Sequence, residues 1–113
     1  MAVTKTIIRD GHGASPSPGD TVTMEYTGYL KDTGCRDNKG KKFDSSVGRG
    51  DFEVVIGRKF VIRGWDEAIP TMKVGEKATL DITSDYAYGK DGFRDVIPPN
   101  SSLIFDVELK KVN

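Results

Sequence analysis

Hydrophobic and polar residues alternate along three separate segments of the chain, residues 21–27, 77–83 and 103–110. In the first of them, Val22, Met24 and Tyr26 are separated by threonine and glutamate residues. A period of two places the apolar side chains of a strand on one face. We therefore predict three half-buried strands, and two weaker ones over residues 4–9 and 52–56, where the alternation is less regular.

One segment has helical spacing instead. Trp65, Ala68, Ile69 and Met72 stand at i, i+3, i+4 and i+7, so they would share one face of a helix. A glycine precedes the segment and Pro70 lies near its end, which limits the helix to about two turns. A helix this short is not stable alone and must pack on the apolar face of the sheet. The pattern predicts an α+β domain.

Two segments rich in turn-forming residues separate the expected strands. Residues 11–20 contain three glycines and two prolines, and residues 32–40 are polar with two glycines. Such segments are typical of the connections between antiparallel strands. We expect hairpins rather than crossover helices, and hence an antiparallel sheet.

The composition fits one compact domain over residues 1–113, with 36% hydrophobic residues in a chain of 113. Lysine and arginine number 17, as do aspartate and glutamate, so no positive field favours nucleic acid as a partner. We see no apolar run of the roughly 20 residues that span a bilayer, and no signal-peptide core at the start. The single cysteine, Cys35, cannot form an internal disulfide. These features lead us to expect a monomer in the cytoplasm, away from membranes.

The same composition restricts the available chemistry. With one histidine, His12, and one cysteine, Cys35, the chain cannot assemble a zinc site of the usual Cys/His kind, and we expect neither metal nor cofactor. A Cys35–His12 nucleophile pair is formally available. Both residues lie in turn-like segments next to glycine, where nothing would fix their geometry, so we do not favour it.

The aromatic residues have two alternative interpretations. The chain contains ten of them, and several stand beside polar residues, as in Phe43-Asp44. Aromatic side chains dominate small cores, so spacing alone favours a structural role. Their number nevertheless exceeds what a two-turn helix on a small sheet needs. Some of them would then line a pocket.

Six sequence blocks carry a resemblance to a known family. They are Phe43-Asp44-Ser45-Ser46, residues 61–66 (VIRGWD), 74–78 (VGEKA), 85–89 (DYAYG), 97–100 (IPPN) and 103–109 (LIFDVEL). Their order and spacing resemble the FKBP family, the tacrolimus-binding peptidyl-prolyl isomerases, over nearly the whole chain. The chain is most similar to the small single-domain cytosolic type, and Phe93, Asn100 and the closing Lys111-Val112-Asn113 resemble fungal members.

The resemblance implies a five- to six-stranded antiparallel sheet wrapped around the short helix, with an apolar pocket between them. Trp65 would form the pocket floor. The residues implied in catalysis are Tyr26, Phe43, Asp44, Trp65, Tyr88 and Phe105. The residues implied in ligand binding are these six together with Arg49, Phe52, Phe60, Val61, Ile62, Phe93, Val96 and Ile97.

The implied activity is cis–trans isomerisation of X–Pro bonds, with X apolar, in aid of protein folding. Tyr88 would donate a hydrogen bond to the bound carbonyl, while Asp44, held by Tyr26 and Arg49, would meet polar groups of the ligand. By the same resemblance, tacrolimus and rapamycin would occupy the pocket, and the drug complex would bind calcineurin or the TOR kinase. Two alternatives remain: a non-catalytic docking module that uses the same pocket, and a purely structural β-domain whose aromatics are all core.

The chain departs from the family pattern at four places. Thr33 to Gly40 form a polar insertion, which a hairpin loop tolerates at little cost. The segment before Phe52 is one residue shorter than usual. Phe60 stands where a polar residue is common, and Arg94-Asp95 replaces a small or proline-containing pair. We expect these last changes to affect substrate preference and contacts with partners.

Overall fold

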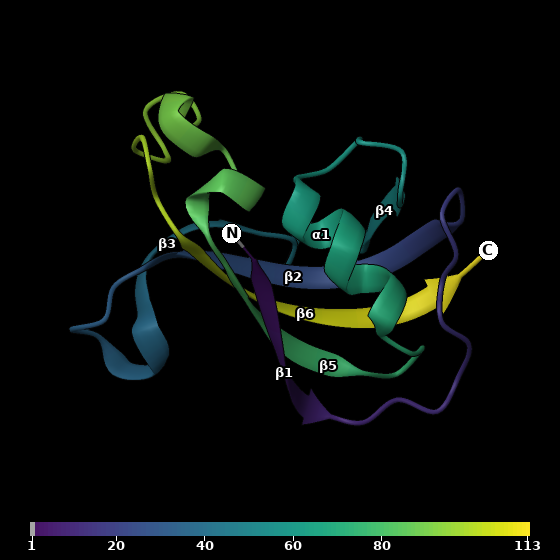
Figure 1. The fold of residues 1–113 in the computed structure, drawn as a ribbon. Coiled ribbons are helices and arrows are strands. Elements are labelled where there is room, and N and C mark those ends of the chain that lie inside the picture. Colours follow the sequence, from purple (N-terminus) through teal and green to yellow (C-terminus); the bar gives the residue numbers. More distant parts are fainter. Residues whose placement is uncertain (1) are drawn as a thin grey trace.

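The computed structural model describes residues 2–113, which form six strands and one short α-helix (Figure 1). The strands are β1 (Val3–Arg9), β2 (Thr21–Lys31), β3 (Lys39–Ser45), β4 (Phe52–Val55), β5 (Lys77–Ile82) and β6 (Leu103–Val112). The α-helix is α1 (Arg63–Ala68), and the 3₁₀ turns are η1 (Arg36–Asn38), η2 (Ile69–Thr71), η3 (Ser84–Tyr86) and η4 (Gly89–Asp91). All five strands expected from the alternation are present.

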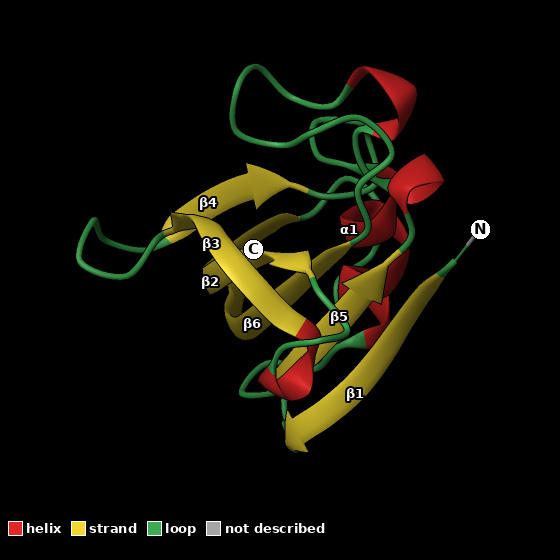
Figure 2. Cartoon of the chain, turned by 90° about the vertical axis from the view of Figure 1, so that its left-hand side faces the viewer, coloured by secondary structure: helices red, strands yellow, loops and turns green. Residues whose placement is uncertain are grey.

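The strands form one antiparallel sheet in the order β1-β5-β6-β2-β3, with β4 also paired to β2 (Figures 1 and 2). Strand β2 is 11 residues long and pairs with two short strands along the same edge. Its residues 27–31 pair with β3, and its residues 21–24 pair with β4. The connection between these partners, residues 46–51, interrupts the edge of the sheet. Asp44 and Phe52 therefore stand on either side of this interruption.

The core lies between α1 and the face of the sheet that the helix crosses (Figure 1). Apolar residues of β2, β5 and β6 point into it at every second position, as the period of two predicts. The fully buried large side chains are Val22, Met24, Ile56, Ile69, Met72, Leu80, Ile82, Leu103, Val107 and Leu109. The predicted α+β class with an antiparallel sheet around one short helix is confirmed.

The helix is short, as the sequence predicts. It begins at Arg63 and ends at Ala68, and η2 continues the chain through Pro70 as a tighter 3₁₀ turn. Proline has no N–H to donate to the preceding turn, which explains the early end of the α-helical segment. Met72 lies beyond the helix but is still fully buried in the core. The spacing thus identified the buried face, and Pro70 limits the α-helix as expected, with Met72 just beyond it.

Strand β3 was not expected from the alternation. Lys39 and Gly40, which the sequence assigns to a polar insertion, already belong to β3, where Lys39 pairs with Lys31 of β2, and the preceding residues form a turn and η1. The Lys39 ammonium donates to Asp106 at 2.6 Å, and this bond raises the lysine pKa. The insertion is therefore fastened to the outer face of the sheet, where Ile104 beside it is 2% exposed.

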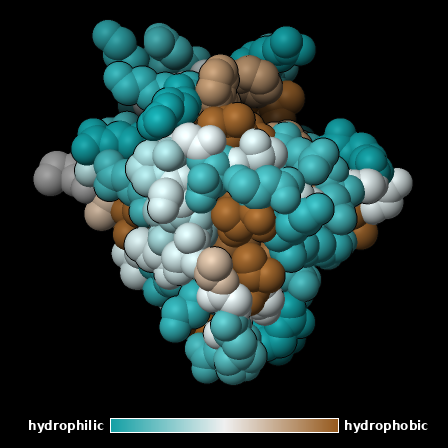
Figure 3. Space-filling model, turned by 90° about the vertical axis from the view of Figure 1, so that its right-hand side faces the viewer, coloured by the Kyte–Doolittle hydropathy of each residue, from teal (hydrophilic) through white to brown (hydrophobic). Residues whose placement is uncertain are grey.

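The surface is mainly hydrophilic, with apolar groups emerging in limited areas (Figure 3). The large hydrophobic side chains that are exposed are Ile7, Ile8, Val47, Phe60, Phe93 and Val96. Within residues 2–113 no helix has the length and apolar character needed to cross a membrane.

Candidate active site

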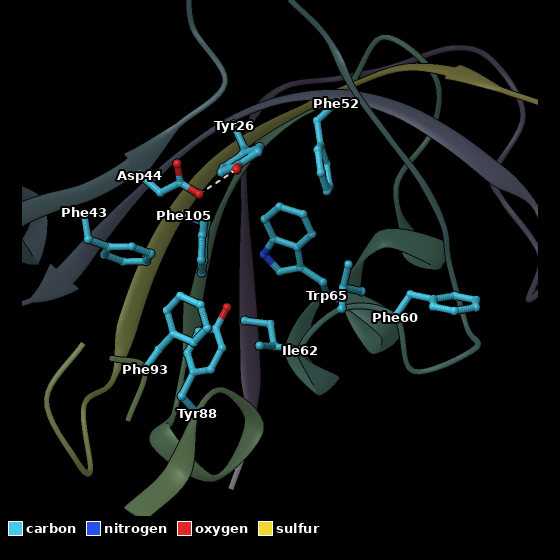
Figure 4. Close-up of a pocket in the computed structure, with 11 residues that line it drawn as sticks. Tyr26, Phe43, Asp44, Phe52, Phe60, Ile62, Trp65, Tyr88, Phe93 and Phe105 are labelled. Carbon is cyan, nitrogen blue, oxygen red and sulfur yellow. Dashed lines mark hydrogen bonds between the residues drawn. The ribbon is translucent and has the colours of Figure 1, made fainter. Parts of the chain in front are cut away.

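A cavity of about 310 Å³ opens between α1, the strands β2 and β3, and the loops that follow β4 and β5 (Figure 4). Of its eleven lining residues, eight are aromatic, one is acidic and two are aliphatic. The lining residues are Tyr26, Phe43, Asp44, Phe52, Phe60, Val61, Ile62, Trp65, Tyr88, Phe93 and Phe105. Aromatic residues therefore form most of a concave surface that carries a single carboxylate.

Edge-to-face ring contacts hold the aromatic walls in place. The Trp65 ring lies 5.1 Å from the rings of Tyr26 and Phe105, at interplanar angles of 77° and 76°. Phe43 meets Phe105 at 5.6 Å and 87°, and Phe52 meets Tyr26 at 5.4 Å and 72°. Perpendicular contacts of this kind are favoured by the ring quadrupoles, so the walls are preorganised for a ligand.

A β-bulge explains why two consecutive residues both line the cavity. Gly28 pairs with Asp44 and Tyr29 with Lys42, so Phe43 is the extra residue between two pairs. A bulge turns a side chain out of the usual alternation, and here it brings Phe43 and Asp44 to the same cavity. At Gly28, an added Cβ would lie 2.6 Å from the Phe105 ring and 2.7 Å from the Phe43 ring. Glycine thus lets these rings meet over the strand.

Trp65 lies in the first turn of α1 and is 5% exposed. Its indole Nε1 has no hydrogen-bond partner in the described part of the chain. Figure 4 shows the nitrogen edge of the indole turned toward Phe105, whose ring is perpendicular to it. An N–H group against an aromatic face gains a weak attraction. This arrangement leaves a largely apolar floor for a ligand.

Asp44 is held by three donors. The Tyr26 hydroxyl donates to Oδ2 at 2.7 Å, and Arg49 Nη2 and the Ser45 backbone N–H donate to Oδ1 at 2.8 Å each. Arg49 is fixed in turn, because its Nε donates to the Ser45 carbonyl at 2.9 Å. The carboxylate is therefore fixed in orientation while 44% of its side chain stays exposed at the edge of the cavity.

Tyr88 projects into the cavity from the loop between η3 and η4 (Figure 4). Its ring lies 5.1 Å from that of Phe93, whose N–H donates to the Ile97 carbonyl at 2.9 Å. The Tyr88 hydroxyl makes no hydrogen bond to any of residues 2–113, so it is available to a ligand. Burial, and then the charge of Asp44, raise its pKa above the ordinary 10.0. The group keeps its proton at neutral pH and can donate it in a hydrogen bond.

Comparisons with known proteins agree with this geometry. Residues 13–110 match the family model described as FKBP-type peptidyl-prolyl cis-trans isomerase. The chain belongs to this family. It is 62% identical over 113 residues to FK506-binding protein 1 of Gibberella zeae, covering 99% of both chains. It is 54% identical over 115 residues to a peptidyl-prolyl cis-trans isomerase of Schizosaccharomyces pombe, covering 100% of this chain and 96% of that protein.

Three residues that the FKBP resemblance implies in ligand binding do not line the cavity. Ile97 is 2% exposed and belongs to the core, and Val96 is 42% exposed outside the cavity. Arg49 lines a neighbouring hollow, which shares Tyr26, Asp44 and Phe52 with the cavity. The other eleven implied residues are all brought together. In residues 2–113, no three histidine, cysteine, aspartate or glutamate side chains are grouped so as to hold a metal ion.

Two residues that shape the site of this FKBP, Gly28 and Asp66, are not among those that the sequence implied. Gly28 admits the rings of Phe43 and Phe105, and a glycine inside an alternating strand is a signal of a bulge or a close approach. Asp66 binds backbone N–H groups of the loop that precedes α1. Its position in the helical segment gives no sign of this role, because the partners are set by the path of the loop.

The Tyr26–Asp44 bond predicts a pH dependence of stability. Burial, followed by the hydrogen bond to Asp44 and its charge, raises the pKa of Tyr26 from 10.0 to about 12. The folded protein then holds this proton more tightly than the unfolded chain does. The resulting stabilisation is complete below pH 10 and is lost as the pH rises from 10 to about 12.

Urea unfolding of the wild type and Tyr26→Phe at a series of pH values tests this expectation. The difference in free energy of unfolding between them should be constant below pH 10 and should narrow above it. If the free energies of unfolding of the two proteins differ by a constant amount through the alkaline range, folding does not shift the pKa of Tyr26.

Proposed function

We propose that this chain catalyses cis–trans rotation about X–Pro peptide bonds in the aromatic cavity over Trp65. The observation that supports this most directly is the combination of a preorganised aromatic surface with one free phenol hydroxyl, that of Tyr88. Membership of an isomerase family agrees with it. The proposed substrate is a proline-containing polypeptide with an apolar residue before proline, and the proposed role is assistance to protein folding.

The chemistry follows from amide resonance. An X–Pro bond rotates slowly because its C–N bond has partial double-bond character, with a barrier of ~18–20 kcal/mol. The twisted transition state loses this resonance, and its carbonyl oxygen carries less negative charge than that of the planar form. An environment of aromatic rings therefore solvates the planar form less well than water does, while it accommodates the twisted form. The enzyme lowers the barrier because it favours the transition state over the ground state.

The polar groups position the substrate. Tyr88 would donate to a carbonyl of the bound chain and fix its orientation over the indole of Trp65. Asp44 would meet polar groups at the mouth, and Tyr26 and Arg49 act as positioning residues for it. An acceleration of ~10⁵ requires about 7 kcal/mol of preference for the transition state, within the range that orientation and removal of water supply.

Ligands and partners belong to the same proposal. The Gibberella zeae relative carries the name FK506-binding protein 1, and FK506 is tacrolimus. We propose that tacrolimus and rapamycin occupy the cavity of this chain, and that the drug complex binds calcineurin or the TOR kinase. We also propose that the chain acts as a monomer, and that it acts in the cytoplasm, because a single cysteine, Cys35, allows no internal disulfide and fits a reducing compartment.

Titration with tacrolimus tests the binding part of the proposal, because the only tryptophan lies in the cavity. We expect a saturable change in Trp65 fluorescence at submicromolar drug, and a weaker affinity in the double variant Asp44→Val/Tyr88→Phe, which keeps the fluorophore. No change in fluorescence, together with no heat of binding by calorimetry, would contradict it. Binding without any acceleration of X–Pro rotation would favour the docking module.

A further inference from the structure

Phe60 is the most exposed of the large hydrophobic side chains in residues 2–113, with 69% of its surface accessible. It is not part of the hydrophobic core, so its ring is not explained by the stability of the fold. Its neighbours Val61 and Ile62 are partly buried and pack against the core. A single exposed ring is common on protein surfaces, so the meaning of this one depends on what it adjoins.

The loop that carries Phe60 is fixed in shape. The Asp66 carboxylate, in the first turn of α1, accepts hydrogen bonds from the backbone N–H of Gly57 at 2.8 Å and of Lys59 at 3.0 Å. Lys59 has a left-handed backbone with φ of 64°, which is costly for a residue other than glycine. The bonds to Asp66 hold the loop in this conformation, and Phe60 follows directly. Its position at the rim is therefore set by the backbone and does not depend on a mobile loop.

Phe60 is continuous with the cavity over Trp65. It belongs to the lining of that cavity, and Figure 4 shows it at the end opposite to Phe43 and Asp44. Most of the ring is exposed and it points away from Trp65 in Figure 4, so it presents an apolar surface on the outer side of the cavity rim. A polypeptide whose proline lies over Trp65 extends beyond the cavity, and a segment that leaves on the side of Phe60 would lie against this ring.

We propose that Phe60 forms an additional apolar subsite that binds a hydrophobic side chain of the substrate outside the X–Pro pair. This inference rests on the proposed isomerase function and extends its substrate class to proline segments with a second apolar residue nearby. At the usual gain per unit of apolar area, covering roughly 40 Å² changes binding by about fivefold. The contact selects substrates by sequence and is made in both the planar and twisted states, so it acts mainly on KM.

Peptides of about eight residues with one central proline test the subsite. At each position outside the X–Pro pair, leucine is compared with glutamine, and kcat/KM is measured by a coupled isomerase assay. The wild type should prefer leucine by about fivefold at one or more positions. Phe60→Gln should reduce this preference to below about twofold, mainly through KM, and Phe60→Leu should retain most of it.

Val47→Gln is the matched control, because Val47 is also exposed, at 61%, and does not line the cavity. It should leave the leucine preference unchanged. If the wild type and Phe60→Gln both accelerate the peptides and show the same preference for leucine over glutamine, the subsite is overturned. The isomerase function would then still stand. Absence of acceleration for every peptide would overturn the isomerase function itself.

Discussion

Replacing Asp44 by valine should lower kcat/KM for an X–Pro peptide by about tenfold or more, and should also lower the free energy of unfolding by about 1.5 kcal/mol. The substitution removes the acceptor of the Tyr26 hydroxyl and the partner of Arg49. A hydrogen bond to a charged group contributes about 1.5–3 kcal/mol, and 1.4 kcal/mol corresponds to a factor of ten. Because the side chain is partly exposed, the lower end of this range applies.

Two further variants show whether the loss comes from the Tyr26–Asp44 bond. Asp44→Asn keeps the shape and one acceptor oxygen, so its activity should lie between those of Asp44→Val and the wild type. Tyr26→Phe combined with Asp44→Val should cost less than the sum of the single changes, because both remove the same bond. Activity of Asp44→Val within twofold of the wild type would contradict a positioning role for this carboxylate.

Gly92→Ala should destabilise the protein by about 2–4 kcal/mol and reduce isomerase activity. Gly92 has φ of 64° and ψ of −157°, a region of backbone space that residues with a Cβ rarely enter. An added Cβ would also collide with the carbonyl of Ile97, which accepts the N–H of Phe93. The change therefore disturbs the loop that carries Phe93 and supports Tyr88.

Gly48→Ala is the matched control for the collision. Gly48 also has a positive φ, of 84°, but no atom lies within 4 Å of the position that a Cβ would take. Strain alone should cost about 1 kcal/mol there. Urea unfolding followed by Trp65 fluorescence measures both variants. Equal losses of stability would show that the contact with the Ile97 carbonyl is relieved without cost.

The sequence pattern predicted most clearly the strands whose inner residues enter the core, and it missed β3. β2, β5 and β6 alternate because their inner residues enter the core. β3 contains three lysines and lies at the edge of the sheet, where its backbone pairing with β2 holds it. Pairing of this kind requires no apolar side chains and leaves no periodic signal.

The site was only partly accessible from the sequence for a related reason. Residue types showed a surplus of aromatics, but the family resemblance was needed to select the cavity residues from the core residues. The bulge turns the side chains of Phe43 and Asp44 into the same cavity. It depends on the pairing of Asp44 with Gly28, which is distant in the sequence. Ile97 was implied in ligand binding and lies in the core, where its carbonyl accepts the backbone N–H of Phe93.

The central claim is that the cavity over Trp65 accelerates rotation about X–Pro bonds. The most direct test measures the exchange rate of a proline peptide between its cis and trans forms by NMR, with catalytic amounts of the protein, in the absence and presence of an equal amount of tacrolimus. Without the protein, exchange takes tens to hundreds of seconds. We predict that the protein makes exchange much faster, and that the exchange rate falls back to the uncatalysed value when tacrolimus fills the cavity. An exchange rate unchanged by the protein, or acceleration that persists with the drug bound, would contradict the account.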